Sequence, residues 1–81
     1  MPSGRQIRAA RALLGISAKE LAERAKVGWA TVQRMEQVDG SPTSRVATLR
    51  QIEAALEKAG IDFIGDPETT PGVRLKAKRG D

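Results

Sequence analysis

Helix start and stop signals crowd the first part of the chain and limit it to short helices. Ser3 with Gln6, and Ser17 with Glu20, have the three-residue spacing of a capping box. Gly15 stands where the first helix would end. Short helices are marginal alone and depend on packing an apolar face against neighbours. We therefore expect a small helical bundle whose first helices cover residues 5–14, 17–25 and 28–37.

Apolar residues recur at spacings of three and four up to residue 59 and at a spacing of two after it. A fourth helix is expected from near Thr43 or Ser44 to about Ala59, with the turn-rich "VDGSPTS" before it and Gly60 ending it. The runs "IDFI" and "VRLKA", separated by "GDPETTPG", then predict a β-hairpin. The fold class is mainly α: a compact four- to five-helix domain (1–60), a short C-terminal hairpin (61–77) and a disordered tail (78–81).

Chain length and composition exclude several kinds of chemistry. The 81 residues include no Cys and no His, which removes disulfides, thiolate chemistry, His-centred catalysis and most zinc or iron sites. So small a domain has little room for an enclosed catalytic pocket. No apolar run is long enough for a signal peptide or a membrane span. We expect a soluble cytoplasmic protein that has no cofactor, no metal and no membrane partner and is not an enzyme.

Charge is unevenly distributed along the chain. Residues 1–34 carry a net charge of +5, residues 35–72 carry −4, and residues 73–81 carry +3. This pattern suits one side that faces a polyanion and another side that makes different contacts. A solvated surface of mixed charge is the alternative interpretation.

The segment "GISAKELAERAKVGWATVQRMEQ", residues 15–37, resembles the helix-turn-helix of Cro/CI-type regulators, the XRE family. The similarity extends from residue 5 to about residue 59. It is carried by Gly15, Leu21, Ala22, Val27, Val32, Glu36 and the loop containing Pro42. It implies that residues 28–37 form the recognition helix, whose first turns enter the DNA major groove.

The helical period divides residues 28–37 into two faces. If Val32 and Met35 point inward, the outward stripe holds Ala30, Gln33, Arg34 and Gln37. Gln can read adenine and Arg can read guanine, each through two hydrogen bonds. The base-reading residues are predicted to be Trp29, Ala30, Gln33 and Arg34.

Trp29, the only Trp, lies between the two faces. Its ring could pack over the end of the preceding helix, or it could press on a thymine methyl group and the groove wall. We expect a combination of both, with a half-buried ring whose edge is outward.

Phosphate contacts are expected from residues that flank the recognition helix. Any one of them could instead be a solvated side chain, and the expectation applies to the group. The group comprises Arg5, Arg8, Ser17, Lys19, Gly28, Thr31, Gln37 and Arg45, with Arg50 beside them.

The sequence departs from the family pattern at three positions. Ala18 stands where relatives often have a backbone-contacting Gln, and Lys26 stands where Gly is common, which implies a positive φ at a cost of about 1 kcal/mol. Gly28 replaces a Ser or Thr N-cap and leaves N–H groups available to a phosphate. Arg11 and Glu36 match a structural ion pair of the family, so Glu36 is not expected to act as a catalytic acid.

These features predict a DNA-binding regulator, most simply a repressor, that binds an inverted-repeat operator as a homodimer. A protein-interaction module, such as an antitoxin or antiactivator that grips a toxin or activator through residues 60–79, is the alternative. The apolar end of the chain is expected to form the dimer interface, although the hairpin could instead fold back over the fourth helix. The interface residues would be Leu56, Ile61, Phe63, Ile64, Val73 and Leu75.

Overall fold

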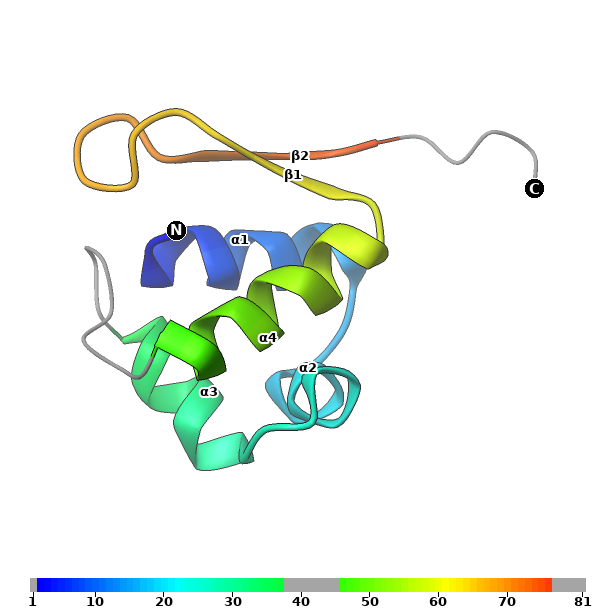
Figure 1. The fold of residues 1–81 in the computed structure, drawn as a ribbon. Helices are drawn as coiled ribbons and strands as arrows, with labels where there is room; N and C mark the ends of the chain where they lie inside the picture. The colour runs from blue at the N-terminus through cyan, green and yellow to red at the C-terminus, as the bar shows by residue number, and fades with distance from the viewer. Residues whose placement is uncertain (1, 38–45, 77–81) are drawn as a thin grey trace.

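A computed structural model describes residues 2–37 and 46–76 of the chain. This part of the chain contains four helices followed by an antiparallel two-stranded hairpin, so the mainly helical fold with a C-terminal hairpin is confirmed (Figure 1). The predicted start of the fourth helix, the loop containing Pro42 and the predicted tail lie outside the described residues. The elements are α1 (Gly4–Leu14), α2 (Ala18–Ala25), α3 (Trp29–Glu36), α4 (Val46–Lys58), β1 (Ile61–Ile64) and β2 (Gly72–Leu75).

Both ends of α1 are closed in the way the sequence predicts. The Ser3 hydroxyl accepts from the Gln6 backbone N–H at 3.2 Å, and Gln6 Oε1 accepts from the Ser3 N–H at 2.8 Å, which completes a capping box. Gly15 follows the helix in the left-handed conformation, with φ of 70°. Glycine adopts that conformation without steric cost, so α1 ends there.

The capping box predicted for α2 is only half formed. The Ser17 hydroxyl accepts from the Glu20 backbone N–H at 3.0 Å, but the Glu20 carboxylate pairs with Arg24 one turn later, at 2.7 Å. The expectation of a reciprocal box is therefore wrong. At the other end, Lys26 has φ of 59° and ψ of 45°, so this non-glycine residue does adopt the left-handed conformation.

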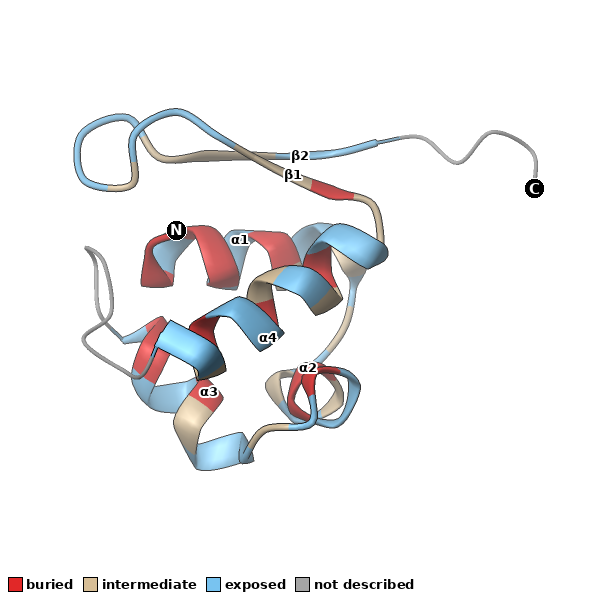
Figure 2. Cartoon of the chain, viewed as in Figure 1, coloured by how far each residue is buried: buried red, intermediate tan, exposed pale blue. Residues whose placement is uncertain are grey.

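One continuous apolar core joins all four helices and the first strand (Figure 2). Val46 in the first turn of α4 and Leu13 near the end of α1 lie outside this core, because Val46 is 56% exposed and Leu13 is 46% exposed. The buried apolar residues are Ile7, Ala10, Leu21, Ala22, Ala25, Val32, Met35, Leu49, Ile52, Leu56 and Ile61.

The hairpin has an apolar and a polar face. Antiparallel pairing sets Ile61 opposite Leu75 and Phe63 opposite Val73, and the alternation of side chains places these four on one face. Asp62 pairs with Arg74 through their side chains on the other face. Phe63 and Val73 pack against the helical core.

A loop of residues 65–71 closes the hairpin. Gly65 has φ of 77°, and a Cβ atom there would lie 1.8 Å from the Thr70 carbonyl oxygen, so only glycine fits. Asp66 Oδ1 accepts from the backbone N–H groups of Glu68 and Thr69, at 2.8 and 3.1 Å. These bonds lower the pKa of Asp66 below its ordinary value, and the bond from Glu68 has the larger effect.

The buried side chain of Gln6 ties the hairpin to α1. Its Nε2 donates to the carbonyl oxygens of Ile64 at 3.1 Å and Gly72 at 2.8 Å, while its Oε1 serves the cap of α1. One amide thus joins the start of the chain to both strands.

The hairpin lies over α1 and α4, on the side of the domain away from α3 (Figure 1). This arrangement corrects part of the predicted dimer interface: Leu56 and Ile61 are each only 1% exposed and belong to the chain's own core. Phe63 and Val73 are partly buried against that core, which leaves only Ile64 and Leu75 exposed among the six predicted residues. Their faces are opposite, because successive strand residues alternate.

Candidate functional site

The outward side of α3 is polar and exposed to solvent. Within this helix, all of which the structure describes, no acidic side chain is exposed. Ala30, Gln33, Arg34 and Gln37 are all exposed, and Thr31 is partly buried. Val32 and Met35 are buried beneath them, at 0% and 1% exposure. The division into two faces expected from the helical period is therefore the one the structure has.

Trp29 opens α3 with 51% of its surface exposed. A ring that only stapled α3 to α2 would be mostly covered, and a ring free of the domain would be more exposed. Half of this large apolar side chain is therefore available to a partner beside Ala30 and Gln33.

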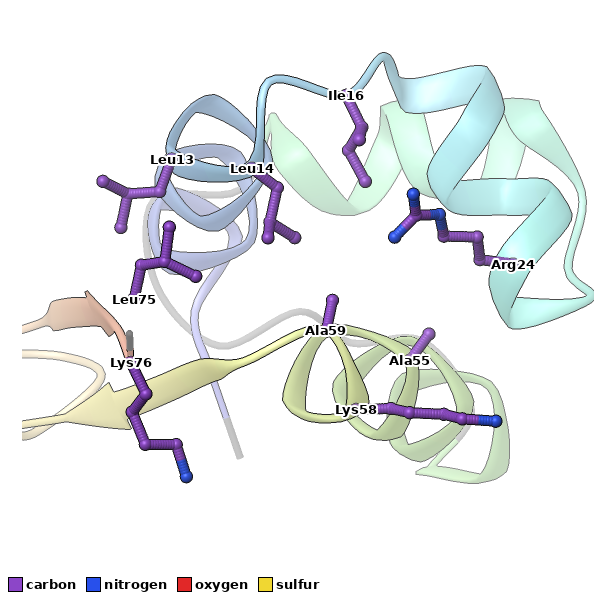
Figure 3. A pocket seen from close by; sticks show the side chains of 9 residues that line it. All are labelled: Leu13, Leu14, Ile16, Arg24, Ala55, Lys58, Ala59, Leu75 and Lys76. Atoms are coloured by element: carbon purple, nitrogen blue, oxygen red, sulfur yellow. The ribbon is translucent and has the colours of Figure 1, made fainter. Parts of the chain in front are cut away.

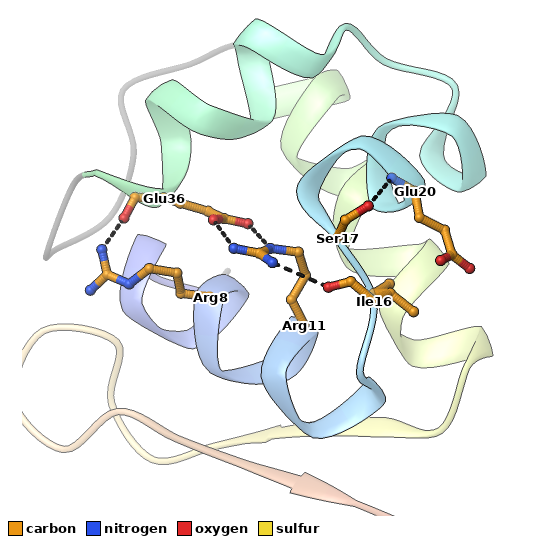
Figure 4. Close-up of polar contacts among 6 residues, drawn as sticks. All are labelled: Arg8, Arg11, Ile16, Ser17, Glu20 and Glu36. Carbon is orange, nitrogen blue, oxygen red and sulfur yellow. Dashed lines mark hydrogen bonds and ion pairs between the residues drawn. The ribbon is translucent and has the colours of Figure 1, made fainter.

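The single carboxylate of α3 is turned away from this face. Glu36 is 6% exposed, and its two oxygens accept from Arg11 Nε and Nη2 at 2.7 and 2.8 Å (Figure 4). This two-pronged geometry is the strong form of an Arg–carboxylate pair. Arg11 Nη1 also donates to the Ile16 carbonyl oxygen at 3.1 Å, so one guanidinium joins α1, the link to α2 and the end of α3. Consequently, no carboxylate of α3 neutralises the charge of Arg34 on the outward face.

The ion pair with Glu36 shifts the pKa of Arg11. The hydrogen bond to Glu36 raises the pKa of Arg11 above its ordinary value, more than partial burial lowers it. An arginine side chain is in any case always protonated in proteins, so the pair with Glu36 has a permanent cation on one side.

Arg8, which the sequence predicts to contact phosphate, makes a structural contact within the domain. Its Nη1 donates to the backbone carbonyl oxygen of Glu36 at the C-terminus of α3 (Figure 4). A cation at that position also suits the negative end of the helix dipole.

The other predicted phosphate-contacting residues fall at helix starts or on exposed surface. Ser17 precedes α2, but its hydroxyl already accepts a backbone bond, while Lys19 is exposed in the first turn of α2. Gly28 precedes α3 without a side-chain cap, which leaves first-turn N–H groups without a side-chain acceptor there. Arg5 and Arg50 are exposed, and Arg45 lies outside the described residues.

A shallow hollow separates the start of α2 from α3. It is lined by Ala18 on α2, by Gln33 and Gln37 on the outward face of α3, and by Arg8, Arg11 and Glu36 behind them. The small side chain of Ala18 leaves this space open, where a longer side chain would fill it. Ala18 therefore borders two of the outward residues of this segment, Gln33 and Gln37, directly.

Two residues make contacts that could not be found from sequence patterns. Gln6 bonds to Ile64, which is 58 positions away, and to Gly72, which is 66 positions away, and Arg8 bonds to the Glu36 carbonyl group, which is 28 positions away. The capping spacing identifies Gln6 as an N3 residue but says nothing of where its amide nitrogen points. Only the docked hairpin reveals its second role.

The described residues, 2–37 and 46–76, include no group of three or more acidic side chains able to hold a metal ion. No helix within them is long and apolar enough to cross a membrane.

No protein-family model matches the chain, and no curated protein is significantly similar to it in sequence. The function is therefore inferred from the geometry of α3 and its surroundings.

Proposed function

We propose that the protein is a sequence-specific DNA-binding regulator of the Cro/CI type that inserts α3 into the major groove. One observation carries the proposal: α3 exposes Gln33, Arg34 and Gln37 while its only carboxylate is buried against Arg11. Such a face offers bidentate readers for adenine and guanine without repelling phosphates. The exposed half of Trp29 supplies an apolar surface for a thymine methyl group.

The surrounding cations support this proposal as positioning contacts. Lys19 lies in the first turn of α2, and Arg5 and Arg8 lie on α1, which packs against α3. Phosphate contacts of this kind fix the register of a protein on the duplex and carry no sequence information themselves. Occlusion of a promoter is the simplest regulatory mechanism for such a domain, and it would operate in the cytoplasm.

The test begins with selection of bound sequences from randomised DNA duplexes. On the selected operator, Arg34→Ala is expected to weaken binding by about 1–3 kcal/mol and to relax preference at one base pair. The measurement is fluorescence anisotropy on the operator and on its single-base variants. Retained discrimination at every base pair would remove Arg34 from the reading role.

Two controls separate base reading from charge. Lys19→Ala is expected to weaken all sequences alike and to lower the salt slope by about one unit. Arg74→Ala removes the same charge on the hairpin, on the side away from α3, and should leave operator affinity nearly unchanged. If Arg74→Ala weakened binding as much as Arg34→Ala, the effect would come from net charge and not from α3.

We also propose that two copies act together on an inverted repeat. One short helix in one groove makes few base and phosphate contacts, and a DNA twofold demands recognition helices about 34 Å apart. Binding should therefore be cooperative when two half-sites are one helical turn apart. Adding about half a turn, 5 bp, between them should abolish the cooperativity. Equal affinity for a single half-site and for the full repeat would show that one copy suffices.

The apolar cluster expected from the sequence cannot join the two copies as a whole, since Leu56 and Ile61 are buried in the chain's own core and Phe63 and Val73 are partly buried against it. Ile64, Leu75 and the backbone edges of the hairpin remain as candidates for this contact. The exposed edge of a two-stranded sheet can pair with a second strand.

A further inference from the structure

An apolar groove of about 800 Å³ lies between the C-terminal ends of α1, α4 and β2 and one side of α2 (Figure 3). No residue of α3 lines it, so it is separate from the proposed DNA-reading face. Its apolar lining consists of Leu13, Leu14, Ile16, Ala55, Ala59 and Leu75.

The groove gathers apolar surface that the fold does not cover. Leu13 is 46% exposed and Leu75 is 43% exposed, and the two side chains lie close to one another at one end of the groove (Figure 3). They are two of only five large apolar residues that are exposed among the described residues. Contiguous exposed apolar surface with a polar rim is typical of an interaction site.

Every charged side chain that lines the groove is basic. Arg24, Lys58 and Lys76 border it, and no carboxylate of the described residues lines it. The Arg24 guanidinium points in between Ile16 and Ala55, although Glu20 occupies one of its nitrogens at 2.7 Å (Figure 3). The groove is thus complementary to an apolar group accompanied by negative charge.

The charge of the groove and its open end favour one kind of ligand over the others. A second copy in a twofold contact would bring two basic patches with no carboxylate together, and the repulsion between like charges opposes that arrangement. The chain's own last residues, "AKRGD", offer two cations and no large apolar side chain. A small amphiphile would need a site that buries most of its surface, whereas Leu13 and Leu75 show this groove to be open along one end.

We propose that the groove binds a short segment of a partner protein in which aliphatic or aromatic side chains alternate with Asp or Glu. The apolar side chains cover Leu13 and Leu75, and the carboxylates meet Lys58, Lys76 and the free donors of Arg24. This goes beyond DNA binding and does not require it, since α3 remains open when the groove is filled.

Selection from a library of short randomised peptides displayed on phage tests the proposal. The wild-type protein is the target, and the Leu13→Asp variant is used for counter-selection. The selected peptides should combine apolar residues with Asp or Glu. As synthetic peptides they should bind wild type at least about tenfold more tightly than Leu13→Asp. They should also bind several-fold more weakly to Lys58→Gln, which removes one cation from the rim.

Matched variants outside the groove provide the controls. Val46→Asp adds an acid at a side chain that is 56% exposed on α4, and Arg74→Gln removes one cation from the polar face of the hairpin. Both should bind the peptides as wild type does. Circular dichroism should show all variants folded, and if Leu13→Asp is not, Leu75→Ser replaces it.

Several results would overturn the proposal. Selected peptides could be basic or uncharged, or none could distinguish wild type from the groove variants. Losses with Val46→Asp equal to those with Leu13→Asp would place binding elsewhere. Sodium dodecanoate that displaced every selected peptide and bound more tightly would assign the groove to an amphiphile, and a solution dimer broken by Leu13→Asp would assign it to a second copy.

Discussion

Arg11→Met is expected to lower the free energy of unfolding by about 3 kcal/mol, a large fraction of the stability of so small a domain. The Glu36 side chain is only 8% exposed, so removing its partner leaves a carboxylate in a buried position without its two hydrogen bonds. The Ile16 carbonyl group loses its donor as well. Urea denaturation of the purified variant measures the change.

Replacing the other partner, Glu36, should lower the free energy of unfolding by less. Glu36→Gln leaves Arg11, whose side chain is 23% exposed and can reach water and the Ile16 carbonyl group. The double replacement Arg11→Met with Glu36→Leu should recover much of the loss, because no charge remains buried. A double-mutant cycle on these variants gives the coupling energy directly.

The ion pair of Glu20 and Arg24 provides a matched control. Its nitrogen–oxygen distance is also 2.7 Å, but its side chains are 45% and 44% exposed. Arg24→Met should change stability by no more than about 0.5 kcal/mol, as is usual for exposed pairs on one helix. Equal losses from Arg11→Met and Arg24→Met would mean that burial of the first pair has no energetic consequence.

Gln6→Glu is expected to cost about 2–4 kcal/mol and to loosen the hairpin. The replacement keeps an oxygen for the Ser3 N–H and so preserves the cap of α1. It removes both N–H donors to the strands and sets a carboxylate against the carbonyl oxygens of Ile64 and Gly72. Thermal unfolding measures the loss, and amide hydrogen exchange in residues 61–64 and 72–75 locates it.

Ser3→Ala separates the cap from the tether, because it removes the hydroxyl acceptor and leaves the amide of Gln6 in place. It should cost about 1 kcal/mol without selective loss of protection in the hairpin. The deficit of Gln6→Glu should also shrink as the pH falls toward about 4, because burial against two carbonyl oxygens raises the pKa of the introduced carboxyl group above its unfolded value of about 4.3 and the protonated group regains a donor. A deficit that does not change with pH would place its origin outside the contacts with the two carbonyl groups.

Local signals in the sequence were sufficient for the helices and the strands. Capping hydroxyl groups, Gly15 and the change of apolar period at Gly60 act over a few residues. Apart from the start of the fourth helix, which lies outside the described residues, the elements lie close to where those signals place them. The two faces of α3 likewise follow from the helical period, once Val32 and Met35 are taken as buried.

Docking of the elements could not be predicted in the same way. The apolar residues of the hairpin were consistent with a dimer surface and with packing over the helices, because a strand pattern states which side chains share a face and not what covers them. The position of Ile61 in the core decides this, and it depends on the angle at which the chain leaves α4. The groove beside Leu75 follows from the same docking and so had no sequence signal.

The double use of Gln6 gives the folding reaction an order. A chain that has formed only α1 can complete the cap, but the amide nitrogen has no partner until residues 64 and 72 are in place. Bringing residues 64 and 72 to Gln6 closes a long loop, which costs chain entropy and is therefore slower than forming a helix. The last event in folding is therefore expected to be the locking of the hairpin onto the first helix, which makes the start and the end of the polypeptide mutually dependent.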